Sequence, residues 1–235
     1  MDATPMVEID QLSFDYPDGH AALREVSFRI AAGERVGLIG SNGAGKSTLL
    51  LQLNGILRGT GSVRVGGLTL SDDTIRRIRA LVGLVFQDPD DQLFSPTVFD
   101  DVAFGPLHMG LPEDEVRRRA AWALDQVQMG AFADRLPHHL SLGERKKIAI
   151  ATVLSMDPVV LALDEPSAGL DPEARDNLIA LLNRLPQAML IASHDLDFVR
   201  QTCSRAILLE HGRVMRSFPA SELASSSTVP VVQAS

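Results

Sequence analysis

The sequence is poor in cysteine, in aromatic residues and in basic charge. Because Cys203 is the single cysteine, an intrachain disulfide and a cysteine-cluster metal site are excluded. Such a low cysteine content is typical of cytosolic proteins. Aromatic residues make up 5% of the chain, so the core must consist mainly of Leu, Ile, Val and Ala. Lys and Arg number 22 against 30 Asp and Glu, and the net charge of −8 disfavours nonspecific binding to nucleic acid, which requires clustered cations. We therefore expect no nucleic-acid partner.

Long hydrophobic runs are also missing. The uncharged apolar run from Ile148 to Met156 has nine residues, whereas a bilayer-spanning helix needs about 20. The segment Met1 to Asp10 contains acidic residues and no basic ones, so we expect no signal peptide. Any membrane role would therefore depend on partner proteins.

The remaining composition is that of a globular protein. Hydrophobic residues make up 45% of the 235 residues, enough for one large α/β domain with or without a small inserted subdomain. Apolar strands alternate with helical patterns, which predicts a mixed, mainly parallel sheet covered on both faces. The expected strands lie at 7–14, 26–30, 35–39, 63–65, 81–86, 159–163, 189–192 and 206–209. We also expect an N-terminal antiparallel β arm, in which Val63 and Val65, with Gly66-Gly67 behind them, form one arm of a hairpin.

The stretch from about 88 to 157 has a different pattern. Pro112 and the three acids after it are typical of a helix start. Apolar residues then recur at helical spacing: Val116, Ala120, Leu124 and Val127. This predicts a helical subdomain inserted into a single domain spanning 1–216. From 217 to 235 there is no periodicity, and we expect a flexible tail.

A glycine-rich loop joins an apolar strand to a helix. Its residues are Gly40, Ser41, Asn42, Gly43, Ala44, Gly45, Lys46, Ser47 and Thr48. Such glycines let backbone N–H groups wrap around phosphate oxygens at a helix N-terminus. Lys46 would place positive charge on the terminal phosphates, and the Ser47 hydroxyl could reach Mg²⁺. The order strand, loop and helix favours this P-loop over a chance glycine-rich turn, and it predicts a nucleoside triphosphatase.

A second apolar strand, Val159 to Leu163, ends in two adjacent acids, Asp164 and Glu165. Ligands of open α/β folds bind at the carboxyl edge of the sheet. We therefore expect Asp164 in the Mg²⁺ shell and Glu165 beside the attacking water. The simpler alternative is a strand capped by solvated acids.

With five further motifs the chain resembles the ABC ATPase family over residues 7–216. In chain order these are Tyr16, Gln87, the signature Leu140-Ser141-Leu142-Gly143-Glu144, the loop Ser167-Ala168-Gly169-Leu170-Asp171, and His194 at the end of a strand. The signature departs from the family pattern Leu-Ser-Gly-Gly-Gln, since Leu142 adds a side chain and Glu144 a negative charge. Ser141 and Gly143 remain, so we expect a functional, retuned site.

The resemblance implies an ATP and Mg²⁺ site shared by two subunits packed head to tail. Tyr16 would stack on adenine, and Ser141 with the Gly143 backbone would reach the γ-phosphate bound to the opposite P-loop. Glu165 would be the general base, His194 would orient the γ-phosphate, and Lys46 would stabilise its charge. Gln87 would link Mg²⁺, held by Ser47 and Asp164, to the helical subdomain, and Asp171 would meet the opposite subunit.

The segment from Val85 to Pro106 is similar to the energy-coupling-factor importers, above all their cobalt and nickel branch. There it helps to grip a membrane-embedded coupling protein, and a substrate-binding membrane component completes the importer. This implies a peripheral location on the cytoplasmic face of the bacterial cell membrane. A simpler interpretation places Leu93, Phe94, Val98 and Phe104 in the core. In that family the ATPase does not touch the substrate, so we expect the six histidines, His138 and His139 included, to bind no cobalt.

Several alternatives remain. The complete motif set fits a homodimer, although a second, different ATPase subunit stays possible. The same ATPase could energise import of biotin, another vitamin or an amino acid. DNA-repair relatives carry a long coiled coil between P-loop and signature, and translation relatives usually join two such domains, so both fit less well. A nucleotide sensor without turnover would normally have lost Glu165 or His194.

Overall fold

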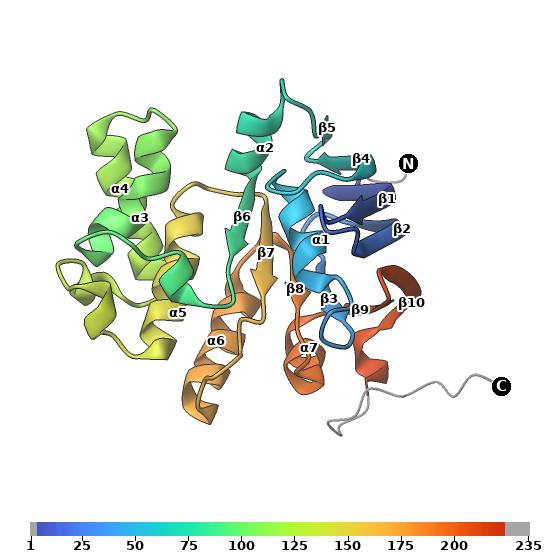
Figure 1. Cartoon of the computed structure of the whole chain (residues 1–235). Coiled ribbons are helices and arrows are strands. Elements are labelled where there is room, and N and C mark those ends of the chain that lie inside the picture. Colours follow the sequence, from blue (N-terminus) through green and yellow to red (C-terminus); the bar gives the residue numbers. More distant parts are fainter. Residues whose placement is uncertain (1–3, 224–235) are drawn as a thin grey trace.

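The computed structural model describes residues 4–223 and contains two sheets with helices around them (Figure 1). The larger sheet has the strand order β10-β9-β3-β8-β7-β6. Its strands are β3 (Arg35–Ile39), β6 (Val82–Val85), β7 (Val160–Asp164), β8 (Ala188–Ala192), β9 (Arg205–Glu210) and β10 (Arg213–Pro219). All pairs in it are parallel except β9 with β10. The predicted mixed, mainly parallel sheet is confirmed.

The smaller sheet is wholly antiparallel and has the order β2-β1-β4-β5. Its strands are β1 (Val7–Asp15), β2 (Ala21–Ile30), β4 (Thr60–Val65) and β5 (Leu68–Thr69). Their buried apolar residues face helix α1 (Lys46–Leu53), which lies between the two sheets in Figure 1. This is the antiparallel arm that the sequence predicts.

The core has two parts because the strands of the larger sheet are buried on both faces. Val160 and Ala162 of β7 pack toward α1 and the antiparallel sheet. Leu161 and Leu163 point to the opposite face, toward the remaining helices. The period of two along the strand therefore assigns alternate residues to the two halves of the core.

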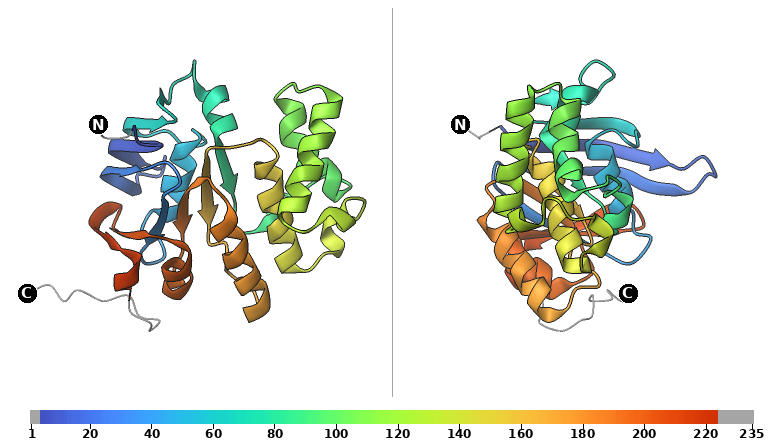
Figure 2. Two further views of the ribbon diagram at one scale, coloured as in Figure 1. Left: turned by 180° about the vertical axis from the view of Figure 1, so that it is seen from behind. Right: turned by 90° about the vertical axis from the view of Figure 1, so that its left-hand side faces the viewer.

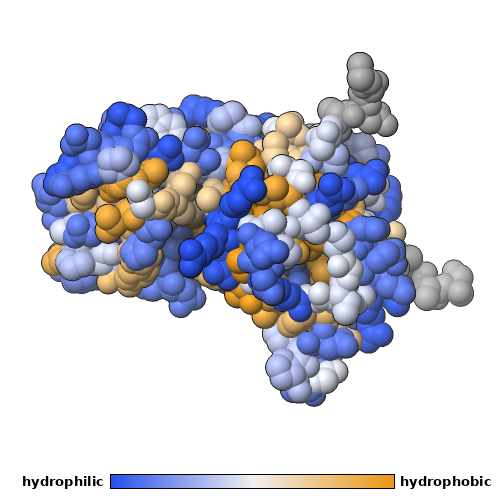
Figure 3. Space-filling model, turned by 90° about the horizontal axis from the view of Figure 1, so that it is seen from above, coloured by the Kyte–Doolittle hydropathy of each residue, from blue (hydrophilic) through white to orange (hydrophobic). Residues whose placement is uncertain are grey.

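Most other helices lie on that opposite face or to one side of the sheet. Helices α3 (Val98–His108), α4 (Glu113–Gln126) and α5 (Leu142–Leu154) form a unit beside β6 (Figure 2), within the segment for which the sequence predicts a helical subdomain. A short 3₁₀ turn, Pro89–Asp91, lies between β6 and α3, and two more, Gly130–Phe132 and Pro137–His139, lie between α4 and α5. Helices α6 (Pro172–Arg184) and α7 (Leu196–Thr202) follow β7 and β8, and α2 (Ile75–Leu81) precedes β6. Seen from above, apolar side chains gather among hydrophilic ones on the helical side (Figure 3).

The prediction of a flexible tail from residue 217 is wrong for the part that the structure describes, residues 217–223. Ser217 to Pro219 complete β10, and a 3₁₀ turn follows at Ala220–Glu222. Ala220 and Leu223 are buried against α7 and the sheet, so apolar contacts hold this segment in place. Residues 224–235 lie outside the described part. Within 4–223, no helix has the length and apolarity that crossing a bilayer requires.

Candidate nucleotide-binding and catalytic site

The P-loop wraps closely because glycines occupy its two tightest positions. Gly40 and Gly45 have φ values of 154° and 104°. A Cβ atom at Gly40 would lie 2.1 Å from the carbonyl oxygen of Leu209, and one at Gly45 would lie 2.5 Å from that of Ala22. Only glycine fits at either position. The loop therefore closes against β9 and β2 immediately before α1.

Lys46 is the cation at the base of this loop. Its side chain is 7% exposed, and its Nζ donates hydrogen bonds to the carbonyl oxygens of Gly40 at 3.0 Å and Ser41 at 3.2 Å. The Glu165 carboxylate lies 3.9 Å from the same Nζ. The ammonium group thus lies between the loop carbonyls and the acid at the end of β7.

Asp164 has an environment that favours a bound cation. Burial raises the pKa of its carboxyl group, and repulsion from Glu165 raises it further. A hydrogen bond with the Ser47 hydroxyl lowers this pKa but does not cancel the increase. Its Oδ1 is buried and has no hydrogen-bond partner among the described residues. A carboxylate oxygen beside a hydroxyl is a donor set that Mg²⁺ prefers, so Asp164 and Ser47 fit the predicted metal role.

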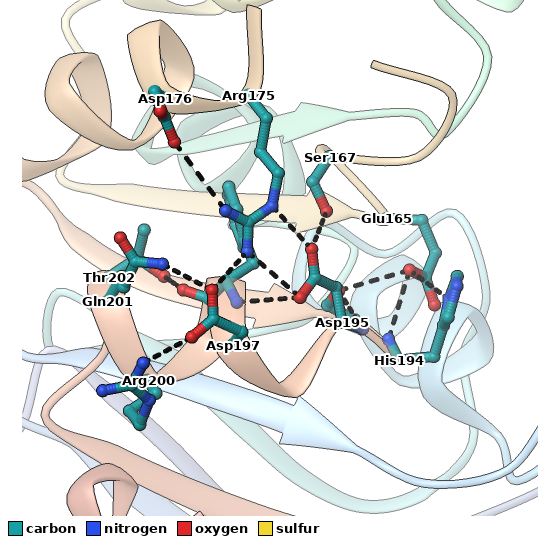
Figure 4. A network of polar contacts seen from close by, with 12 residues as sticks. Glu165, Ser167, Arg175, Asp176, His194, Asp195, Asp197, Arg200, Gln201 and Thr202 are labelled. Carbon is teal, nitrogen blue, oxygen red and sulfur yellow. Dashed lines mark hydrogen bonds and ion pairs between the residues drawn. The ribbon is translucent and has the colours of Figure 1, made fainter. Parts of the chain in front are cut away.

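Glu165 and His194 face each other across the carboxyl ends of β7 and β8 (Figure 4). Glu165 is 7% exposed, and its Oε2 lies 2.8 Å from His194 Nδ1 and 3.3 Å from the backbone nitrogen of His194. The backbone of Glu165 has a φ of 43°, a left-handed conformation that costs a non-glycine residue about 1 kcal/mol or more. With this backbone, the Glu165 carboxylate lies in contact with the His194 imidazole.

An open hollow of about 320 Å³ lies over the P-loop. Its lining consists of Tyr16, His20, Ala22, Asn42, Gly43, Gly45, Lys46, Ser47, Thr48, Gln87 and Glu165. The Tyr16 hydroxyl is 3.0 Å from that of Thr48, and the rings of Tyr16 and His20 lie 6.4 Å apart at an interplanar angle of 26°. The structure thus brings Tyr16, most of the P-loop, Gln87 and Glu165 to one cavity, and it adds His20, which no sequence motif indicates. The other predicted residues, Gly40, Ser41, Ala44, Asp164 and His194, lie outside this lining, and Ala44 is buried within the loop.

The signature residues lie outside this lining, as a site completed by a second subunit requires. Ser141 is the N-cap of α5 and Glu144 is its third helical residue, and together they form a capping box. The Glu144 Oε2 accepts from the Ser141 nitrogen at 2.8 Å and from the Ser141 hydroxyl at 2.9 Å. The departure to Glu144 is therefore compatible with a well-capped helix.

The other departure, Leu142, contacts the loop predicted to meet the opposite subunit. A Cβ atom at Gly169 would lie 2.9 Å from the Leu142 side chain, and one at Gly143 would lie 3.1 Å from Ala174. The signature and the 167–171 loop therefore pack against each other. Asp171 caps α6 by accepting from the nitrogen of Ala174 at 2.8 Å.

An ion-pair network supports the residue that follows His194 (Figure 4). Arg175 of α6 contacts Asp195 at 2.9 Å and Asp197 at 3.0 Å. Burial opposes ionisation of Asp195, but Arg175 and the backbone N–H of Phe198 outweigh it and lower the pKa of that carboxyl. The network fixes the start of α7, and with it the backbone next to His194.

Lys146 is a site residue that the sequence motifs do not indicate. It lies on α5 and is 5% exposed, and its Nζ donates to the carbonyl oxygens of Gln87 at 3.1 Å and Glu165 at 3.2 Å. Burial lowers its pKa, although Asp88, Glu165 and Asp164 counteract this. The sequence contains one indication of its role. Lys146 lies at helical spacing with Ala149, Ile150 and Val153, on a buried face where an apolar residue is usual.

Comparisons with known proteins agree with this geometry. Residues 23–168 match the family model described as ABC transporter. The chain is 53% identical over 219 residues to an ABC transporter ATP-binding protein of Geobacter sulfurreducens, covering 93% of this chain and 88% of the relative. It is 50% identical over 216 residues to the energy-coupling factor transporter ATP-binding protein EcfA of Methanothermobacter thermautotrophicus, covering 89% and 70%.

A solved structure gives the same fold. The cbiO1 protein of Clostridium perfringens, part of the ABC transporter complex cbiONQ, matches with a TM-score of 0.84 and 40% identity, over 93% of this chain and 90% of that one. These findings confirm the resemblance seen in the motifs. The chain belongs to the ABC transporter family of ATPases, as one of its ATP-binding subunits.

Proposed function

We propose that two copies of the chain hydrolyse ATP at their shared interface to energise an energy-coupling-factor importer of cobalt or nickel ions. The observation that carries this proposal is the cluster of Lys46 and Glu165, both buried, with the half-buried Asp164 beside them, at the open hollow over the P-loop. A phosphate-binding cation, a metal-binding acid and a proton acceptor are the parts that phosphoryl transfer to water requires.

Each residue has a distinct part in the reaction. Glu165 accepts the proton of the attacking water, because its Oε2 is held in place by His194 and by the backbone. His194 orients the γ-phosphate, since its side chain is 65% exposed beside Glu165. Lys46 offsets the charge that develops on the phosphate oxygens. Mg²⁺, held by Ser47, Asp164 and Gln87, would neutralise further phosphate charge when bound.

The second subunit supplies the remaining face of the site. Ser141 and Gly143 lie outside the hollow of their own subunit, so they are available to the ATP of the opposite one. A dimer of the ATP-binding cassette MJ0796 bound to ADP and Pi has the same fold as this chain, with a TM-score of 0.80 and 29% identity, over 92% of this chain and 99% of that one. This likeness supports a dimer.

Exposed aromatic residues support a membrane-embedded coupling protein as partner. Phe94 and Phe104 are 67% and 40% exposed, and their rings lie 5.0 Å apart. Asp101 fixes the loop before α3 by accepting from the backbone nitrogens of Phe94 and Ser95. The core interpretation holds for Val98, which is fully buried, whereas the two phenylalanines form a rigid apolar anchor of the kind that dominates protein interfaces.

The transported ion is the finer part of the proposal. The cbiO1 relative and the Val85 to Pro106 segment support the cobalt and nickel branch, and the EcfA relatives leave biotin or another vitamin as the alternative. The complex would lie at the cytoplasmic face of the bacterial cell membrane, with a substrate-binding membrane component beside the coupling protein.

Uptake of labelled cobalt, nickel and biotin tests this proposal, in cells expressing the chain with its native membrane partners. Metal uptake by wild type that is lost with Glu165→Gln is the expected result. Biotin uptake alone would overturn the metal assignment and keep the importer.

Capture of the membrane partners tests the docking surface separately. Phe94→Ser with Phe104→Ser should abolish co-purification and leave basal ATPase activity within about twofold, since neither residue lines the nucleotide hollow. Trp122→Ser is the matched control, because Trp122 is 43% exposed on the same helical unit. Equal loss with the control would contradict the assigned surface.

A further inference from the structure

A buried lysine is costly for a folded protein. Desolvating an ammonium group costs several kcal/mol, and a well-packed apolar side chain is often at least as stable at such a position. Lys146 nevertheless lies on the buried stripe of α5, beside Ile150 and Ala149. Its two hydrogen bonds, to carbonyl oxygens on separate loops, indicate what the buried charge achieves.

The first of these loops carries the general base. The left-handed backbone of Glu165 is held from both sides, because its N–H donates to Ala192 O at 2.9 Å and its carbonyl oxygen accepts from Lys146 at 3.2 Å. Loss of Lys146 would leave this carbonyl with one donor, the backbone N–H of Ala168 at 3.1 Å, and would loosen the hold on the strained residue. The carboxylate would then move away from the place of the attacking water.

The second loop carries Gln87, which lines the nucleotide hollow. Its carbonyl oxygen accepts from Lys146 at 3.1 Å. The same loop is attached to α5 again through Gln92, whose Nε2 donates to Ala149 O and to the Thr152 hydroxyl, both at 2.8 Å. Helix α5 is therefore bonded directly to both loops that face the ATP of its own subunit.

In the proposed dimer, the N-terminus of α5 faces the ATP of the other subunit. Ser141, its N-cap, belongs to the signature that meets the ATP of the other subunit. Lys146 follows five residues later, about 7.5 Å along the helix axis. A small rotation or shift of this helix on binding of the partner's ATP would move Lys146 and, through it, both carbonyls.

We propose that Lys146 is a positioning residue that ties the loops of Glu165 and Gln87 to the signature helix, and so couples ATP at the signature to hydrolysis in the same subunit's own site. This inference rests on the proposed two-subunit ATPase. It gives each dimer a direct mechanical connection between its two ATP sites. Neither site would reach full activity before the other is occupied.

The test compares steady-state ATPase activity of purified wild type, Lys146→Met and Lys147→Met. Methionine keeps the length of the side chain and removes both hydrogen bonds, and Lys147 is the half-buried neighbour on the same helix. We expect Lys146→Met to lower kcat at least about tenfold, because misplacement of a catalytic group by about 1 Å costs up to about a hundredfold. Its Hill coefficient for ATP should fall to about 1 from a wild-type value above 1. ATP affinity should change less than about threefold, and Lys147→Met should match wild type.

Lys146→Gln is the second variant, because it keeps one donor if methionine prevents folding. We expect for it a kcat between those of wild type and Lys146→Met. A folded variant, Met or Gln, with kcat within twofold of wild type and an unchanged Hill coefficient would overturn the inference. A lower kcat with unchanged cooperativity would overturn the coupling. Absence of ATPase activity in wild type would instead contradict the proposed function.

Discussion

Replacing Glu144 with Gln is expected to tighten the association of two ATP-loaded subunits. In the capping box, the Ser141 hydroxyl donates to Glu144 Oε2 at 2.9 Å and accepts from the Glu144 nitrogen at 3.3 Å. A Gln side chain has the same length, and its carbonyl oxygen can accept from the same two donors, the Ser141 backbone nitrogen and the Ser141 hydroxyl. The helix start should therefore persist, and the change in unfolding free energy should stay under about 1 kcal/mol.

The magnitude follows from the distances around Ser141. A phosphate oxygen bonded to its hydroxyl would lie about 2.7 Å away, which places it within about 6 Å of the Glu144 carboxylate. Two unit charges at about 6 Å repel by about 0.7 kcal/mol in water and by about 3 kcal/mol at an effective dielectric constant of 20. Removing the charge should thus strengthen each ATP contact by about threefold to about a hundredfold.

Sedimentation of dimers formed with ATP measures this effect. Both proteins should carry Glu165→Gln, so that hydrolysis does not dissolve the dimer. The Glu144→Gln protein should dimerise more tightly at low salt, and the difference should shrink at about 1 M salt as the repulsion is screened. Glu144→Ala serves as control, since it removes the charge and the capping box together. Weaker or equal dimerisation by a stably folded Glu144→Gln protein would refute the reasoning.

Three further substitutions test other parts of the site. Lys46→Ala should weaken ATP binding by about tenfold to a hundredfold in calorimetric titration, because charged hydrogen bonds contribute about 1.5–3 kcal/mol, and unchanged affinity would contradict its phosphate role. Tyr16→Ala should cost about 1–3 kcal/mol of ATP affinity if the ring stacks on the base, and Tyr16→Phe should retain most of it. Arg175→Met should lower the unfolding free energy at pH 7 by about 1–3 kcal/mol in urea titrations. Since the folded pKa of Asp195 is lowered, this loss should shrink as pH falls below the unfolded value of about 3.9 toward the folded one, and a pH-independent difference would argue against the ion pair.

Much of the fold could be predicted because its strands are buried on both faces. Continuous apolar runs such as those of β3 and β7 are typical of buried parallel strands, and glycines mark the loop that must approach phosphate closely. The P-loop, Gln87 and Glu165 follow the ends of the parallel strands β3, β6 and β7, so their meeting at the hollow follows from the parallel order, whereas Tyr16 follows β1 of the antiparallel sheet. In the buried strands and in the glycine-rich loop, the sequence pattern and the chemical properties of the residues therefore predict the same structure.

The rest depends on contacts that sequence spacing does not contain. Ser217 to Pro219 lack a clear apolar period, yet they pair with β9, since an edge strand needs only one partner. Exposure of Phe94 depends on how its loop bonds to Asp101, and burial of Lys146 depends on two carbonyls that lie 59 and 19 residues away in the chain. Such side chains gain their roles only when the tertiary structure places partners around them.

We propose Glu165 as the general base of an ATPase formed by this chain. Steady-state hydrolysis and ATP binding of wild type and Glu165→Gln test this role, with the exposed Glu173→Gln as control. We expect Glu165→Gln to bind ATP with wild-type affinity, to form a long-lived dimer and to lose at least about a hundredfold in turnover. Full hydrolysis by a folded Glu165→Gln protein would contradict it.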